Sequence, residues 1–170
     1  MDQTVTTARA AEIVAIGYEG LRSYLKRGLL GSSGLMAPFV HPNSPAPDLS
    51  RVRAKWKRFG VVDLCLMRLA KQLIDLGLSF EQANGIASRD EVRKILARDR
   101  DTTGATLMAW PPYYDFIVFA GHDLRHLPDR LAEVGDVAVL VQLDRIADHV
   151  RSEIDKGTDV LAPAMAAEDQ

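Results

Sequence analysis

Apolar residues recur at three- and four-residue spacing over much of the first hundred positions, which is the pattern of amphipathic helices. The first run begins at Thr7, a residue type that caps helices, and stops at Gly17. A second run follows at once and closes at Gly28, with leucines on one side and basic or hydroxyl side chains on the other. Two short helices joined by a glycine turn predict a helix-turn-helix, although a generic helical hairpin gives the same pattern.

The next stretch, residues 31–48, contains four prolines and a Gly-Ser-Ser-Gly run, so it cannot be helical. Extended pieces at residues 35–40 and 52–59 predict a two-stranded wing with the proline-rich loop at its tip. The second piece alternates basic residues with Trp56 and Phe59. That alternation suits a strand that turns cations toward phosphate and aromatic rings toward the protein.

Helical periodicity then returns. The longest helical signal starts at Val61 and ends at Gly77, and its apolar stripe is wide enough to face a core. Ser79 and Gln82 form the ends of an S-x-x-Q capping box, which predicts a further helix, and a related run covers residues 90–96. The charged cluster at residues 98–104 predicts a domain boundary.

Behind that boundary the pattern changes to short β-rich runs. Residues 105–110 and 114–120 predict two strands around a proline turn, and a continuous apolar run at residues 137–143 predicts a buried third strand. Helices are expected at residues 127–134 and from Leu143 to Gly157.

The expected fold class is therefore α+β, with two units. A winged helix-turn-helix unit with a helical extension covers residues 7–98, and a small β-β-α-β-α module covers residues 102–157. The two ends, residues 1–6 and 162–170, are predicted to be disordered.

Charge divides the chain in the same way. Residues 1–58 hold 9 Lys and Arg against 4 Asp and Glu, residues 59–100 hold 7 against 6, and residues 101–170 hold 5 against 13. The net charges are +5, +1 and −8, which together give the overall −2. A basic front suits a polyanionic partner, whereas the acidic rear would be repelled by one.

Composition excludes several classes of protein. With 47% apolar residues the chain can bury a core, and its single cysteine excludes an intramolecular disulfide framework. No apolar run approaches the roughly 18 residues of a membrane span, and the N-terminus has no signal-peptide pattern. We therefore expect a cytoplasmic protein without a membrane partner.

The string RAAEIVAIGYEGLRSYLKRGLL, followed by WKRFGVVDLCLMRLAKQLIDLGLSFEQA, resembles the MerR family of winged-helix transcription regulators. The likeness covers residues 8–87. Arg58 and Phe59 resemble the arginine-aromatic pair of the family's wing, which contacts phosphate. The motif of the recognition helix is matched at Arg22, Tyr24, Gly28, Leu29 and Leu30. Ser23 replaces an aromatic residue, the wing is longer and richer in proline, and the long dimerising coiled coil is missing. The resemblance implies DNA binding, but it does not carry over the family's DNA-distorting activation or its small-molecule sensing.

Candidate DNA-binding residues lie on the second helix and on the wing. Arg22 is the candidate for a base or nearby phosphate, because a guanidinium can bind guanine O6 and N7 together. The basic residues around it are expected to bind phosphates, and a merely solvated basic face is the alternative interpretation. The full set is Tyr18, Glu19, Arg22, Ser23, Tyr24, Lys26, Arg27, Arg53, Lys55, Lys57 and Arg58.

Other chemically interesting residues favour structural roles. His122 and His126 have an i, i+4 spacing but lack a third ligand at a recognised spacing, so no metal is expected. Cys65 falls on an apolar helix stripe and is expected in the core. Trp110, Tyr113 and Tyr114 suit a core edge, or a platform for a peptide or ligand. No phosphate-binding glycine loop or nucleophile motif is present, so neither a catalytic site nor a cofactor is predicted.

The sequence thus predicts a sequence-specific regulator that binds double-stranded DNA in the nucleoid as a homodimer joined by the rear module, where a small-molecule or protein effector could also bind. Two alternatives remain open at this stage. The first is an excisionase-like architectural protein that bends DNA, and the second is a protein-interaction adaptor that acts through the rear module. An enzyme built on the rear module is the weakest alternative.

Overall fold

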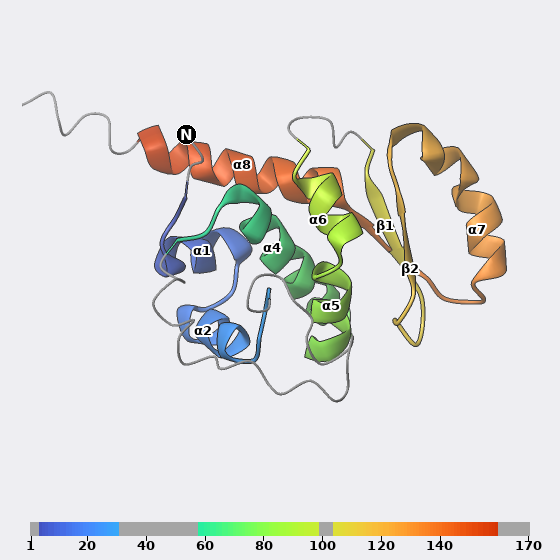
Figure 1. Ribbon diagram of the computed structural model, residues 1–170, viewed down its shortest axis with the longest axis horizontal. Helices are drawn as coiled ribbons and strands as arrows, with labels where there is room; N and C mark the ends of the chain where they lie inside the picture. The colour runs from blue at the N-terminus through green and yellow to red at the C-terminus, as the bar shows by residue number, and fades with distance from the viewer. Residues whose placement is uncertain (1–3, 31–57, 99–103, 160–170) are drawn as a thin grey trace, which may run out of the picture.

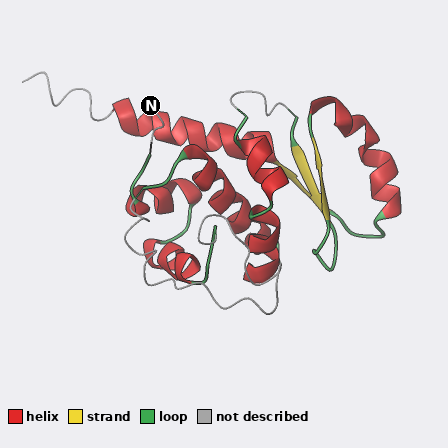
Figure 2. Ribbon diagram, viewed as in Figure 1, coloured by secondary structure: helices red, strands yellow, loops and turns green. Residues whose placement is uncertain are grey.

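A computed structural model describes residues 4–30, 58–98 and 104–159 of the 170-residue chain (Figure 1). Five α-helices come first and a three-stranded sheet with its helices follows, so the molecule is mainly helical with a small β layer (Figure 2). The front elements are α1 (Thr7–Val14), α2 (Tyr18–Lys26), α4 (Val61–Asp75), α5 (Phe80–Ala87) and α6 (Asp90–Leu96). The rear elements are β1 (Thr106–Ala109), β2 (Phe116–Phe119), the 3₁₀ helix η2 (Gly121–His126), α7 (Leu127–Glu133), β3 (Val139–Gln142) and α8 (Leu143–Asp159).

The α+β class and the order of the rear elements are confirmed, and several boundaries differ from those expected. The first helix ends at Val14 rather than Gly17, because Ala15 takes the left-handed conformation with φ 59° and closes it. Gly157 does not end the last helix, which continues to Asp159. The 3₁₀ helix was not expected. The two strands predicted for the wing, at residues 35–40 and 52–59, lie almost entirely outside the described residues, Arg58 and Phe59 excepted.

The sheet has the order β2-β1-β3, and both pairs are antiparallel. Side chains alternate across it, so Leu107 and Val141 face the helical core while Met108 and Leu140 point to the other face. Figure 1 shows α7 on that other face, across the sheet from the front helices. The third predicted strand is confirmed as β3, but the prediction that it is buried is wrong, because β3 is an edge strand and Leu140 is 46% exposed.

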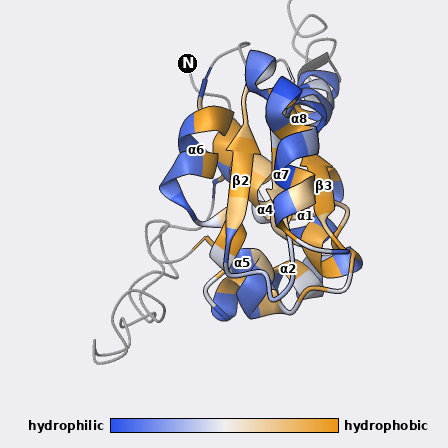
Figure 3. Cartoon of the chain, turned by 90° about the vertical axis from the view of Figure 1, so that its right-hand side faces the viewer, coloured by the Kyte–Doolittle hydropathy of each residue, from blue (hydrophilic) through white to orange (hydrophobic). Residues whose placement is uncertain are grey.

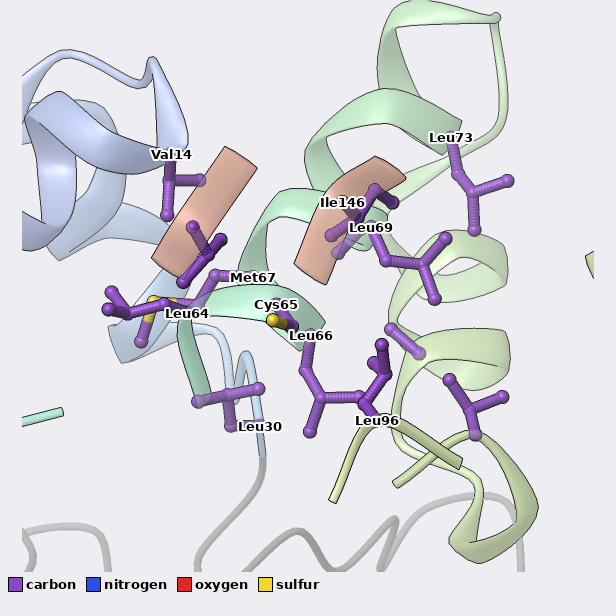
Figure 4. Close-up of a cluster of buried hydrophobic side chains, with 14 of the residues drawn as sticks. Val14, Leu30, Leu64, Cys65, Leu66, Met67, Leu69, Leu73, Leu96 and Ile146 are labelled. Atoms are coloured by element: carbon purple, nitrogen blue, oxygen red, sulfur yellow. The ribbon is translucent and has the colours of Figure 1, made fainter. Parts of the chain in front are cut away.

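The long helix α8 joins the two halves of the molecule. It runs along α4 and α1 (Figure 1), and the Arg9 guanidinium of α1 donates a 2.6 Å hydrogen bond to the Glu153 carbonyl. Its apolar stripe lies in the same cluster as the front helices, and Figure 4 shows Ile146 beside Leu69 and Leu73 of α4. The stripe consists of Leu143, Ile146, Ala147, Val150 and Ile154.

Hydrophobic packing connects the two expected units. The buried residues of the segments 7–98 and 102–157 form one continuous hydrophobic cluster rather than two. The sequence signals a boundary by charge at residues 98–104, but charge at a connection does not show where the next helix will pack. The apolar faces of α4 and α8 cover each other, so each half supplies part of the other's core.

The N-terminal segment is expected from the sequence to be disordered up to residue 6, and the structure corrects this for residues 4–6. Val5 pairs with Phe59 as an antiparallel bridge, with N–H to O distances of 2.9 Å in both directions. Thr6 is the N-cap of α1, and its hydroxyl oxygen accepts from the Arg9 amide. Within the described segments, no helix is both long enough and apolar enough to cross a bilayer.

The capping box predicted at the start of α5 is confirmed. The Ser79 hydroxyl oxygen accepts from the Gln82 amide at 3.1 Å, and the Gln82 side-chain oxygen accepts from the Ser79 amide at 2.9 Å. These two bonds satisfy donors at the helix end that would otherwise have no partner within the helix.

Replacing Ser79 with Ala is expected to lower the free energy of unfolding by about 1 kcal/mol, because the variant cannot accept the hydrogen bond from the Gln82 amide. In a chain of this size the melting temperature should fall by about 2–4 °C. Circular dichroism melts would measure the shift, with Ser152→Ala as the control because Ser152 is exposed within α8. A shift equal in both variants would contradict a specific capping role.

Candidate nucleic-acid interface

A tight turn joins α1 to α2. Only residues 15–17 separate the two helices, Ala15 adopts the left-handed conformation, and Gly17 is the N-cap of α2. A Cβ on Gly20 would lie 3.1 Å from the Ile16 Cγ2 atom, so this glycine allows the turn to approach the helix closely. A short connection with a glycine is compatible with a helix-turn-helix and equally with a generic helical hairpin.

The inner face of α2 is anchored to the rest of the fold. Leu21 is fully buried, and the Tyr24 ring lies 5.3 Å from the Phe80 ring of α5, centroid to centroid. Behind the helix, Asn84 of α5 donates to the Gly28 carbonyl at 3.2 Å and accepts from the Leu30 amide at 3.4 Å. These contacts fix the helix, so its outer face has a defined orientation.

The outer face of α2 is a continuous polar stripe. Its residues follow the helical spacing that places side chains on one face, and each of them is exposed. Arg22 is 47% exposed; its guanidinium lies 3.2 Å from a Glu19 carboxylate oxygen and 5.8 Å from the centre of the Tyr18 ring. The stripe consists of Tyr18, Glu19, Arg22, Ser23 and Lys26, all of them candidates from the sequence.

Two other candidates on this helix are engaged elsewhere. Tyr24 faces Phe80, as described above. The Arg27 guanidinium lies 4.0 Å from the Phe80 ring centre and 2.8 Å from Glu81 Oε1, and this hydrogen bond contributes to a lowered pKa of the Glu81 carboxyl, after that from the backbone. Both residues therefore act mainly as links between α2 and α5, and Arg27 is half-exposed beside the stripe.

The candidate wing residues are only partly described. Arg58 is exposed and lies next to Phe59, whose backbone pairs with Val5 immediately before α1. The pairing therefore brings Arg58 and Phe59 beside the N-terminal end of α1. Arg53, Lys55 and Lys57 lie outside the described residues.

Sequence reasoning missed Asn84 as a residue that holds the C-terminal end of α2. Its side chain also accepts a hydrogen bond from the Ser88 hydroxyl at 3.2 Å, so its oxygen and nitrogen both serve the end of α2 or the next turn of α5. The sequence does contain one indication of this role. Asn84 lies between two small residues in a short amphipathic helix, and an Asn side chain in such a place often forms hydrogen bonds with nearby backbone groups.

The histidines and tyrosines of the rear half each have an identifiable position in the structure. His122 and His126 fall in the 3₁₀ helix, where His122 lies 3.1 Å from an Asp123 oxygen and His126 lies 3.1 Å from Arg125 Nε. Within residues 4–30, 58–98 and 104–159, no three metal-ligating side chains cluster. Tyr113 packs at the edge of the core, whereas Tyr114 is exposed.

Cys65 is confirmed as a core residue. It is fully buried on α4 (Figure 4), and burial raises the pKa of its thiol to about 12 despite the opposing effect of Arg151. The thiol therefore stays protonated near neutral pH, which makes it a packing group rather than a nucleophile.

No model of a known protein family matches the chain, and no curated protein is significantly similar to it.

Proposed function

We propose that this protein is a sequence-specific regulator that binds double-stranded DNA and inserts the outer face of α2 into the major groove. The observation that carries the proposal is the anchored helix itself. One face of α2 is held by Leu21 and Tyr24, and the opposite face presents Arg22 and Lys26 to solvent. A recognition helix needs this division, because its orientation must be fixed before its side chains can meet base edges.

The arrangement around α2 supports the same function. Phe59 pairs with Val5 just before α1, so the exposed Arg58 lies beside the start of that helix. The resemblance of the sequence to the MerR family implies a phosphate-contacting step at Arg58 and Phe59. Arg58 and the basic segment before it would bind phosphates beside the groove that α2 reads.

The acidic part of the molecule is compatible with this orientation. In Figure 1 the long helix α8 lies on the side of α1 away from α2. A DNA duplex on the outer face of α2 would therefore lie on the side opposite α8, which belongs to the acidic part of the chain. A homodimer would place two such helices on half-sites about one helical turn apart.

Selection from a random duplex library, followed by fluorescence anisotropy, tests the proposal. The wild-type protein should select a defined motif with two copies bound per site, and log K should fall with log salt by about 0.9 for each phosphate contacted. Arg22→Ala should relax the preference at one base pair, with a loss of about 1–3 kcal/mol of binding free energy for the preferred base there. Lys26→Ala should weaken binding to all sequences alike.

The outcome also separates the alternatives. Genomic sites at promoters would support a regulator, and sites at the ends of mobile elements would support an architectural role in recombination. Salt-independent binding or the absence of any selected motif would refute DNA recognition by α2.

A further inference from the structure

We propose that the groove beside β3 is a binding site for an amphipathic monocarboxylate, and that its occupancy acts on the helix-turn-helix through Arg68. The second half of this proposal rests on the proposed DNA-binding function. The first half, ligand binding, stands without it.

The groove has a volume of about 700 Å³. Residues of α4 and α8 line one side, residues of η2 and α7 line the other, and the edge strand β3 runs between them. Figure 3 views the molecule from this side, with α7 and β3 toward the viewer. Sites for small organic molecules are concave and typically enclose about 300–1,000 Å³.

One part of the lining is apolar and open to water. Leu76, which follows α4, is 58% exposed and Leu140 of β3 is 46% exposed, although both are large aliphatic side chains. Leu124, Leu127 and Ile146 complete this part. An apolar ligand body laid here would be stabilised by about 25 cal/mol for each Å² removed from water.

The lining also carries positive charge. Arg68 and Arg145 both line the groove, together with the amides of Gln72 and Gln142. None of the ion pairs found among the described residues involves either arginine. Guanidinium groups bind carboxylates in a fork of two hydrogen bonds, so a single carboxylate head on an apolar body matches this lining.

Arg68 also connects the groove to the helix-turn-helix. Its Nη1 donates to the Ile13 carbonyl at 3.1 Å, and His149 Nε2 lies 3.2 Å from the same oxygen. Ile13 lies in the last turn of α1, two residues before Ala15, whose left-handed conformation starts the turn into α2. A carboxylate that competes for the Arg68 guanidinium would therefore change a hydrogen bond that holds this turn, and the two sites would be coupled.

Isothermal titration calorimetry of the full chain with decanoate and with decanol tests the site. Decanoate is expected to bind at least tenfold more tightly than decanol, which has the same body without the charge. Arg145→Gln should lower the affinity for decanoate about tenfold and leave the affinity for decanol unchanged. Leu140→Asp should lower both affinities. Arg130→Gln is the control, because Arg130 pairs with Glu133 on α7 and does not line the groove.

Two results would overturn the site: equal affinities for decanoate and decanol, or equal losses of affinity in Arg145→Gln and Arg130→Gln. Absence of decanoate binding at 1 mM would do the same.

The coupling has its own test. Decanoate should shift the amide NMR signals of Ile16 and Gly17 in the wild type but not in Arg68→Gln, and it should change the affinity for the selected DNA at least threefold. Binding without movement of these signals would refute the coupling and leave the site in place. Movement of the signals in a protein that fails to bind DNA would refute the proposed function and leave the coupling in place.

Discussion

A chain that ends at Gln142, and so lacks α8, is expected to show no cooperative thermal transition. Four large side chains of α8 are buried in the common core: Leu143, Ile146, Val150 and Ile154. Burial of each such side chain is worth roughly 1.5–3 kcal/mol. Their sum is of the order of the whole stability of a typical domain, about 5–15 kcal/mol.

Circular dichroism and scanning calorimetry would measure this loss of stability. A chain ending at Asp159 retains all of α8 and is the matched control. The full-length variant Val150→Asp, which places a charge in the same buried stripe, should also lose stability without any change of length. If residues 1–98 or 102–157 alone gave a cooperative transition, the chain would contain two independent cores and the continuous packing would not determine its stability.

A second large effect is expected for the triple variant Arg22/Lys26/Arg58→Ala. All three side chains are exposed around α2 and its flanking segment, so the fold should persist while the affinity for DNA falls at least a hundredfold near physiological salt. The slope of log K against log salt concentration should become shallower by up to about 2.7, or about 0.9 for each phosphate that the variant no longer neutralises.

The control for this variant removes the same charge from other surfaces. Lys94, Arg125 and Arg130 are exposed on α6, η2 and α7, and their replacement by Ala should leave the affinity within about threefold of wild type. If the two triple variants bound DNA equally, the weakened binding would reflect net charge alone and α2 would not be the recognition element.

The sequence predicted the elements of this fold better than their packing. Period and caps are local properties, so α4, the Ser79 capping box and the strands β1 and β2 could be placed from neighbouring residues alone. The packing of α8 on α1 depends on contacts such as His149 with Ile13, which are 136 positions apart. No periodicity in either helix indicates its partner.

The candidate interface shows the same limit. Helical spacing placed Arg22 and Lys26 on an outward face, and both are exposed in the structure. The same spacing could not show that Tyr24 and Arg27 are drawn toward Phe80 and Glu81, because those partners follow more than 50 residues later. Which polar residues of a surface helix remain free for a ligand depends on neighbours that the helix itself does not encode.

The burial of Cys65 gives the protein an internal reporter. It is the single cysteine of the chain, and its raised pKa leaves only a trace of reactive thiolate at neutral pH, while the surrounding leucines exclude reagents. Modification by a thiol reagent therefore requires the core around α4 to open, and the labelling rate measures how often it does so. Because α4 packs against both α1 and α8, this one sulfur reports the opening of both halves of the molecule, and no cysteine has to be introduced.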